Sequence, residues 1–523
     1  MDSTNLYNPV RSTAYIIILT MIVGALQLAW SVEFSEATPF LLSLGISKHV
    51  LALIWLAGPL SGTLGQPIVG LLSDKCDMTI GRRRPFVIGG CLATVASLLY
   101  LSHSATIVGW FVPGNDITLI NKWTVPFASI GIYVLDFSIA VIQASCRALI
   151  VDVVPTDQQQ IANAWAARMI GIFNILGFWI GTLNLKSLLP FLGDTQFKVL
   201  SILVSTIMIV LVSFCCYVIK ERNPRTDVTI RIDEKETNIF IIIRSFFKQV
   251  ISSVTRLPRQ VKVVCYAQFF AWIGYFPMLF YTSTYVGELY LYELGYNNPQ
   301  ILPPDQRQEL LDEGTRRGTL ALLVHAIVTL VVDLALPFLV DNFKSNKYIN
   351  VRTMWIYSHI VFIIATLSTF FISTSTQAIV LFGFLGIPWG CAVWIPFVLI
   401  SEEISRIKDI KAEQIYEKQK KQMERLNEHD SQEFGDDSEK YDSGILLAIH
   451  NVFVSAPQML SSLGSSVLFA LFKTSDPDEY DDSLGWIFRI GGIVCIGALI
   501  LSTRVKSKQD LLEEDEHELS DFS

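Results

Sequence analysis

Repeated apolar runs of about 20 residues set the strongest limit on how this chain can fold. Twelve such runs lie near residues 14–35, 50–72, 86–104, 127–151, 166–187, 197–219, 263–285, 318–340, 353–373, 378–400, 443–472 and 486–503. Each run is long enough to cross the hydrocarbon core of a bilayer as a helix. Only 17% of the 523 residues are charged, whereas soluble proteins carry about 25%. The sequence therefore predicts an all-α integral membrane protein with 12 transmembrane helices.

These runs form two sets of six, separated by a charged stretch. We expect an N-terminal six-helix bundle over 1–219, a cytosolic linker over 220–262, a C-terminal six-helix bundle over 263–506 and an acidic cytosolic tail over 507–523. Basic residues collect in alternate loops, which predicts that both termini face the cytosol. The arrangement resembles the plan of the major facilitator superfamily.

Several classes of function are disfavoured by missing patterns. The sequence contains no Gly-rich phosphate loop, no His-Glu-x-x-His zinc pattern and no serine nucleophile elbow. We therefore expect no enzymatic activity, no metal and no bound cofactor, and no nucleic acid as partner. Transport by such a chain either uses an ion gradient or is passive. The charged loop over 401–442 fits a surface helix with a disordered end, or else a regulatory docking site.

The segment "GLLSDKCDMTIGRRRPF", residues 70–86, joins the second and third runs. Gly70 and Gly81 permit close approach of helices, and Asp74 can lie against a helix N-terminus or pair with an arginine, with Arg82 and Arg83 in the same segment. Such a pair predicts a latch that holds one conformation of a transporter and releases it in another. The alternative is that the arginines only set the topology. A degenerate echo, "PFLVDNFKSNK", occupies the same place in the second half.

The fourth run, "YVLDFSIAVIQASCRALIVD", carries charges at membrane depth. Asp136, Gln143 and Arg147 share one helix face and extend over about 16 Å of its axis. That spacing is too long for a direct Asp136–Arg147 salt bridge, so each group needs another partner, water or a substrate. Arg147 offers donors to sugar hydroxyls and Asp136 offers acceptors. The other interpretation is an internal polar network between helices, and Asp152 is expected at the membrane edge.

Further polar residues occur within the apolar runs. Glu33 and Glu36 are three residues apart and share a side of an α-helix, with Glu36 expected nearer the interface. We expect either of them to line the substrate cavity or to lie near its outer mouth, and Glu33 to bind substrate or to share the coupled proton with Asp136. The remaining candidates for substrate binding are Gln27, Gln66, Asn174, Asn451 and Gln458. The alternative for half or more of the last four is a hydrogen bond that only bridges two helices.

Eight segments together resemble the glycoside–pentoside–hexuronide branch of the major facilitator superfamily, above all plant sucrose transporters and fungal α-glucoside permeases. They are "TPFLLSLGI", "LIWLAGPLSGTLGQPIVGLLSDKC", "GRRRPF", "LDFSIAVIQASCRAL", "IANAW", "AWIGYFPMLFYT", "GIPWGCAVWIPF" and "LLAIHNVFVSAPQMLSSLGSS". The resemblance implies proton-coupled uptake of a sucrose-type disaccharide. It also implies that Asp136 is the family's fourth-span aspartate, linked to protonation, and that Arg147 is its sugar-binding arginine.

The chain departs from the plant pattern at three places. Glu33 stands where plant members have glutamine, and Thr282 and Thr284 stand where they have two aspartates. Lys48 aligns with a plant loop histidine, with His49 beside it. These differences favour a fungal-type member that accepts maltose or other α-glucosides as well as sucrose.

The leading hypothesis is a monomeric sugar–proton symporter of the plasma membrane that works by alternating access, the vacuolar membrane being the other location considered. The alternatives are an uncoupled sugar facilitator, a carrier of a different small polyol or sugar, and a non-transporting sugar sensor. Sucrose and maltose are not ranked by the sequence.

Overall fold

The computed structural model describes residues 9–221, 257–296, 302–343, 348–425, 443–474 and 480–506, together with residues 244, 248, 252 and 511. Most of the predicted linker over 220–262, the loop beyond residue 425 and nearly all of the tail over 507–523 lie outside the described residues. The described part of the loop over 401–442 continues a helix as far as Arg425.

Helices account for the regular structure of the described residues, and no strand occurs among them. The first group comprises α1 (Thr13–Val32), η2 (Glu33–Ala37), α2 (Thr38–Ser43), α3 (Lys48–Ile54), α4 (Ala57–Leu60), η3 (Ser61–Gly65), α5 (Gln66–Asp74), α6 (Arg84–Gly109), α7 (Ile117–Val153), α8 (Gln159–Thr182), α9 (Leu185–Leu188) and α10 (Gln196–Val218). The second group comprises α12 (Arg259–Glu293), α13 (Pro304–Asn342), α14 (Val351–Leu367), α15 (Ser375–Phe384), α16 (Gly386–Arg425), α17 (Ser443–Phe472) and α18 (Ser483–Ser502).

The described chain contains 12 helical segments long and apolar enough to cross a membrane. They coincide with the twelve apolar runs, so the predicted all-α membrane fold is confirmed. The first two crossings are each built from several consecutive helices, Thr13–Ser43 and Lys48–Asp74, rather than from one continuous α-helix.

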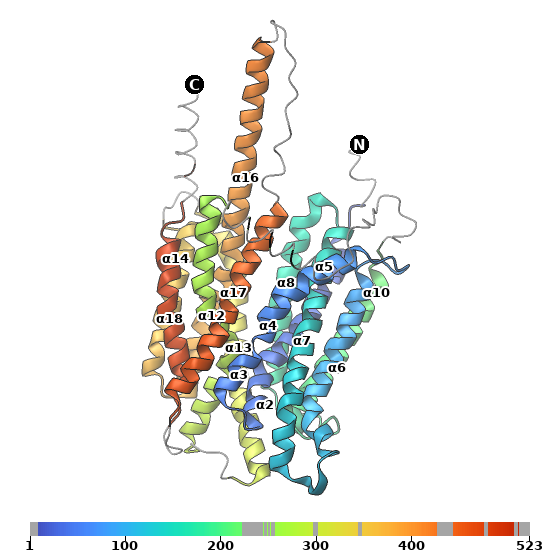
Figure 1. Ribbon diagram of the computed structural model, residues 1–523, viewed down its shortest axis with the longest axis vertical. Helices are drawn as coiled ribbons and strands as arrows, with labels where there is room; N and C mark the ends of the chain where they lie inside the picture. Colours follow the sequence, from blue (N-terminus) through green and yellow to red (C-terminus); the bar gives the residue numbers. More distant parts are fainter. Residues whose placement is uncertain are drawn as a thin grey trace.

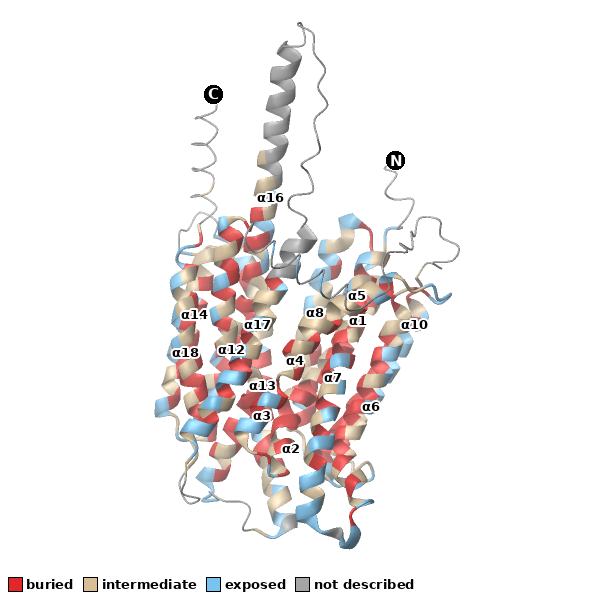
Figure 2. Cartoon of the chain, viewed as in Figure 1, coloured by how far each residue is buried: buried red, intermediate tan, exposed pale blue. Residues whose placement is uncertain are grey.

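The two groups of helices lie side by side (Figure 1). In the first group α1 packs against α8 and α10, and α6 packs against α7; in the second, α12 packs against α13, α17 and α18. The groups meet where α8 packs against α13, α3 against α17 and η2 against α12. Buried side chains concentrate inside the molecule, while large apolar side chains such as Val210 and Phe214 remain exposed on its outside, as expected of a surface that faces lipid (Figure 2).

The long helices run between two opposite ends of the molecule. The end at which α1 begins and α18 finishes, uppermost in Figure 1, is called the terminal face. The opposite end, at which α6 and α12 finish, is called the distal face. The helix α16 extends beyond the rest of the bundle at the terminal face (Figure 1).

Prolines inside the membrane segments free backbone carbonyls that hydroxyl groups then use. Pro39 has no N–H to donate to the carbonyl four residues earlier, that of Ser35, and this oxygen accepts a hydrogen bond from Ser283 Oγ of the second group at 2.8 Å. Pro277 in the same way frees the carbonyl of Ile273, which accepts from Ser461 Oγ at 2.8 Å. The sequence thus places proline where neighbouring helices supply the missing donor.

Candidate functional site

A pair of buried carboxyl groups lies at the centre of the candidate site. Asp136 on α7 is fully buried, and Glu33, the first residue of the π-helical segment η2, has only 1% of its surface exposed. The two carboxyl groups approach each other closely enough for a hydrogen bond once one of them carries a proton. The backbone of α4 packs closely against Asp136, because a Cβ atom added at Gly58 would lie 3.6 Å from Asp136 Oδ1.

Neither carboxyl group finds a donor in the described chain. No described group donates a hydrogen bond to either oxygen of Glu33 or of Asp136. Ionised carboxylates only accept hydrogen bonds, and two of them buried together cannot both keep their charge. The geometry therefore favours a pair that holds at least one proton between its members.

The rest of the predicted stripe continues along α7 towards the terminal face. Gln143 is half-buried and accepts a hydrogen bond from Gln66 Nε2 on α5 at 2.9 Å. Arg147, one turn further, is exposed to solvent although it lies within a membrane-spanning segment. In the described part of the chain its guanidinium forms no ion pair, and Asp136 is not its partner. An unpaired guanidinium at this depth is available to a polar ligand.

The other predicted binding residues surround this stripe at different depths. Gln27 on α1 and Asn174 on α8 are half-buried, as is Gln458 on α17. Asn451 on α17 is exposed and lies towards the terminal face. In the described chain, none of these four side chains forms a hydrogen bond to Glu33, Asp136 or Arg147. Of the predicted site residues, the structure brings together Glu33 with Asp136 and Gln66 with Gln143.

Glu36 lies in a different environment from the one expected. An interfacial position sharing the side of Glu33 was expected, but Glu36 is 4% exposed and faces Asp312 and Arg316 of α13, in the second group of helices. Residues 33–37 form a π-helix, whose wider turn rotates each residue less than an α-helix does. The side chain of Glu33 therefore faces Asp136 of the first group of helices, whereas the side chain of Glu36 faces the second group.

The residues of the predicted latch form a compact ionic cluster at the terminal face. Arg83 pairs with Asp74 and with Asp152, the latter at 2.9 Å, and Arg82 pairs with Asp152 at 3.2 Å. Asp152 was expected at the edge of the membrane and lies in the last turn of α7. Burial lowers the pKa of Arg83, but its bonds to Asp152 and Asp74 outweigh burial and raise that pKa above its usual value.

Two backbone features shape this cluster. Gly70 supplies a carbonyl oxygen that accepts from Arg83 Nη1 at 3.4 Å. Gly81 has φ of 121°, a left-handed conformation that favours glycine, and Glu221 packs against it. The carboxylate of Glu221 accepts hydrogen bonds from the backbone N–H groups of residues 82, 83 and 84 at 2.8, 2.8 and 2.6 Å, and so caps the start of α6.

At the distal face one lysine connects the two groups of helices. Lys48 Nζ, at the start of α3, lies 2.9 Å from Glu288 Oε2 on α12 and 3.0 Å from Asp481 Oδ2 before α18. These three side chains are called the distal clasp. Thr38 Oγ1 adds a hydrogen bond to the carbonyl of Phe280 at 2.9 Å. The distal contacts hold the two groups together at this end.

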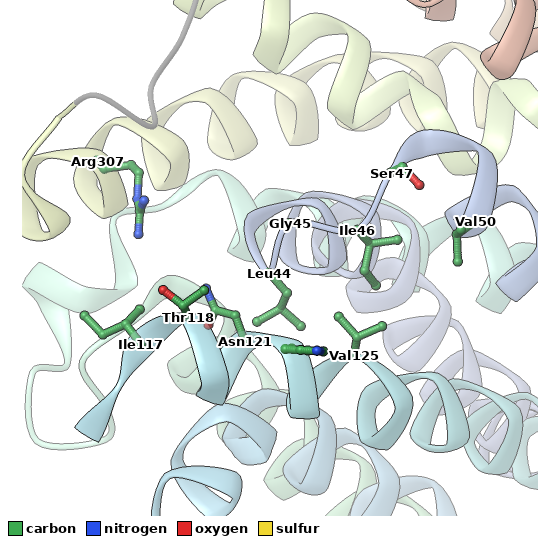
Figure 3. A pocket seen from close by; sticks show the side chains of 11 residues that line it. Leu44, Gly45, Ile46, Ser47, Val50, Ile117, Thr118, Asn121, Val125 and Arg307 are labelled. Atoms are coloured by element: carbon green, nitrogen blue, oxygen red, sulfur yellow. The ribbon is translucent and has the colours of Figure 1, made fainter. Parts of the chain in front are cut away.

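A pocket of about 560 Å³ opens beside these contacts (Figure 3). Its walls are the turn around Gly45, the beginning of α7 with Thr118 and Asn121, and Arg307 of α13. It lies at the distal face, apart from the Glu33–Asp136 pair.

Three intramembrane polar groups of the second half were not singled out from the sequence. Asp333 on α13 is half-buried, has an oxygen without a donor and lies against Gly390. The half-buried indoles of Trp272 and Trp389 meet edge to face with centroids 5.5 Å apart, and Trp272 Nε1 has no partner in the described chain. Asp333 could have been singled out from the sequence, because an ionisable residue inside a membrane span is a candidate functional group by default.

Comparisons with known proteins agree with this architecture. The family model described as Major Facilitator Superfamily matches residues 12–408. A general alpha-glucoside permease of Schizosaccharomyces pombe is 34% identical over 93% of this chain and 92% of its own. A sucrose transport protein of Arabidopsis thaliana is 24% identical over 91% and 88%, and one of Oryza sativa subsp. japonica is 26% identical over 75% and 76%.

Solved structures show the same fold at low sequence identity. A D-xylose-proton symporter superposes with a TM-score of 0.55 at 13% identity, covering 94% of this chain and 97% of its own. A structure described under substrate recognition in proton-dependent oligopeptide transporters gives a TM-score of 0.59 at 11% identity, covering 94% and 98%.

Proposed function

Because the chain belongs to the major facilitator superfamily, we propose that it carries α-glucosides such as sucrose and maltose across a membrane together with protons, by alternating access. The observation that carries the proposal is the buried Glu33–Asp136 pair, which lacks donors in the described chain, together with the exposed Arg147 on the helix of Asp136. The 34% identical permease, named for α-glucosides, supports the class of substrate.

The two ends of the α7 stripe perform different tasks in this proposal. Arg147 presents a planar fork of donors to sugar hydroxyls, while Gln66 and Gln143 hold each other in place beside it. The Glu33–Asp136 pair holds the coupled proton. Binding of sugar and proton together permits the two groups of helices to rock, because a charged pair would otherwise remain buried without compensation.

The orientation and location belong to the proposal as well. Basic residues favour the cytosol for the terminal face, which places the distal clasp outside, at the plasma membrane. With the cell interior negative, one proton supplies about 2.3 kcal/mol per 100 mV. Since a tenfold ratio corresponds to about 1.4 kcal/mol, this supports a sugar gradient of about 50-fold. A single chain contains both groups of helices, so the monomer is the proposed functional unit.

The test is uptake into vesicles that carry an imposed proton gradient. Asp136→Asn is expected to abolish uphill accumulation of sucrose and maltose while leaving downhill exchange measurable. Glu33→Gln is expected to lower accumulation as well, because it breaks the proton-sharing pair. Asp194→Asn is the matched control, since Asp194 is exposed and pairs with Lys198 at 2.7 Å, within the first group of helices. Full uphill accumulation by Asp136→Asn would contradict the proposal.

An uncoupled facilitator is the second candidate. Addition of sugar would then cause no movement of protons in any variant, whereas the proposed symporter alkalinises the outside solution as sugar enters.

A further inference from the structure

Glu36 lies inside the seam between the two groups of helices at the distal end. The residues on either side of it are bonded to the second group: the carbonyl of Ser35 accepts from Ser283 Oγ at 2.8 Å, and Thr38 Oγ1 donates to the carbonyl of Phe280 at 2.9 Å. The Glu36 side chain is 4% exposed, and its Oε1 atom has no partner in the described chain. A buried carboxylate oxygen without a donor is costly.

Across the seam, Glu36 faces another acid. Asp312 of α13 is 8% exposed and accepts hydrogen bonds from Gln308 Nε2 at 2.8 Å and from the backbone N–H of Gln196 at 3.5 Å. Both carboxylate oxygens of Asp312 therefore already accept hydrogen bonds from groups other than Glu36. Arg316 of α13 acts electrostatically on Glu36, but it forms no ion pair with either carboxyl group in the described chain.

The other charged groups around Glu36 are engaged elsewhere. Glu33, on the same π-helical segment, faces Asp136. Glu288 on α12 belongs to the distal clasp with Lys48. Lys186 on α9 acts on Asp312 from the far side. Among the described residues, the seam therefore contains two carboxyl groups, contributed by different halves of the molecule, that form no ion pair with a cation.

This arrangement exists only while the distal end is closed. When the two groups of helices separate at this end, Glu36 moves away from Asp312 and becomes hydrated. Burial and the neighbouring negative charge, which both disfavour the charged form of Glu36, are then removed. A carboxylate that is solvated in one state and buried beside another carboxylate in the other state must take up a proton as the second state forms.

We propose that Glu36 is a second proton-binding group, which takes a proton from the outside solution as the distal end closes against Asp312. The chemical step is the addition of one proton from water to the Glu36 carboxylate, giving a neutral acid with an O–H donor. The pocket of about 560 Å³ shown in Figure 3 reaches α13 at Arg307, the neighbour of Gln308. The inference rests on the proposed alternating-access function.

The test measures closure directly in the full-length protein, reconstituted in liposomes. Spin labels at Trp110→Cys and Leu294→Cys report the distance between the distal ends of α6 and α12, because both positions are exposed, at 75% and 48%. Cys76→Ser removes the one cysteine that is not buried. In the parent, we expect the closed-to-open ratio to fall by up to about tenfold per pH unit as pH rises through the titration of Glu36.

Glu36→Gln is neutral at every pH. At both about pH 5.5 and about pH 7.5, we expect this variant to show the closed-to-open ratio that the parent has when Glu36 is protonated. Asp312→Asn removes the facing charge and is expected to flatten the same dependence. Glu313→Gln is the matched control on α13: Glu313 accepts from Tyr290 Oη at 2.6 Å within the second group of helices, so this variant is expected to keep the parent profile. A Glu36→Gln profile identical to that of the parent overturns the inference.

Uptake measured on the same samples separates this inference from the proposed function. If Asp136→Asn still drives uphill accumulation, the symport proposal fails whatever the labels report. If the parent couples sugar to protons but closes independently of pH, only the role of Glu36 is overturned.

Discussion

Lys48→Met isolates the contribution of the distal clasp to the equilibrium between closed and open distal ends. Methionine keeps most of the apolar stem of lysine but removes its charge. The substitution leaves Glu288 and Asp481 facing each other without the ammonium group that lies 2.9 and 3.0 Å from them. The clasp forms only when the halves meet, so its loss acts on the closed state.

The size of the effect follows from the burial of the three side chains. Their exposed fractions are 15% for Lys48, 26% for Glu288 and 30% for Asp481. Exposed ion pairs contribute about 0.2–1 kcal/mol, and breaking a fully buried pair costs about 3–5 kcal/mol. For two partly buried pairs we expect about 1–2 kcal/mol, which shifts the closed-to-open ratio by about 5- to 30-fold towards open.

The distance between labels at Trp110→Cys and Leu294→Cys measures this shift. Lys48→Arg, which keeps the charge, is expected to retain most of the closed population. Lys198→Met is the matched control, because Lys198 pairs with Asp194 at 2.7 Å inside one group of helices. An unchanged distance distribution in Lys48→Met would refute the assignment of the clasp as a bond between the halves.

The Asp481 arm of the clasp also has a defined pH dependence. Burial raises the pKa of Asp481, but the ammonium group of Lys48 outweighs burial and holds that pKa below its usual value. A lowered pKa in the closed state means that the arm stabilises closure above pH of about 4 and is lost only as pH falls through the lowered value. Asp481→Asn is therefore expected to shift the label distances equally at about pH 5.5 and about pH 7.5.

Two further substitutions test the site and the packing. Arg147→Lys is expected to raise the KM for α-glucosides at least about tenfold in uptake assays, because an ammonium group cannot reproduce the planar fork of donors; unchanged KM would remove Arg147 from the binding site. Gly318→Ala is expected to lower the free energy of unfolding by about 2 kcal/mol or more in detergent, because its Cβ would overlap the carbonyl of Ser283. Gly464→Ala, with nothing within 4 Å of the added Cβ, is its control and is expected to leave stability unchanged or to raise it by about 0.5–1 kcal/mol.

The length of the hydrophobic runs determines most of the fold. An apolar run of about 20 residues has one solution in a bilayer, the helix, so the twelve crossings could be predicted directly. The breaks inside the first two crossings could not. In the first crossing, Ser283 of another helix donates to the carbonyl freed by Pro39, and such a tertiary bond leaves no periodic signal in the sequence.

Prediction of the site had a similar limit. Helix spacing gave the one face shared by Asp136, Gln143 and Arg147, because residues on one helix have fixed relative directions. It could not give the partner of Asp136, since Glu33 belongs to another helix. For Glu36, α-helical spacing predicted the same side of the helix as Glu33. This prediction was wrong because the local turn is π-helical and therefore wider. Asp312 was overlooked because it lies in a charged stretch at the helix start, where an acid needs no special explanation.

The two titrating positions make separate contributions to transport. Glu36 faces the distal seam, and we infer that it takes its proton as this seam closes and returns it to the same side when the seam reopens. A proton returned to its own side is not transported, so Glu36 affects the pH dependence of closure without adding to the charge carried. We therefore expect Glu36→Gln to keep the parent's ratio of protons to sugar, and Asp136→Asn to bring this ratio close to zero, in simultaneous measurements of sugar uptake and external pH. A ratio that falls in Glu36→Gln as far as in Asp136→Asn would show instead that Glu36 lies on the path of the transported proton.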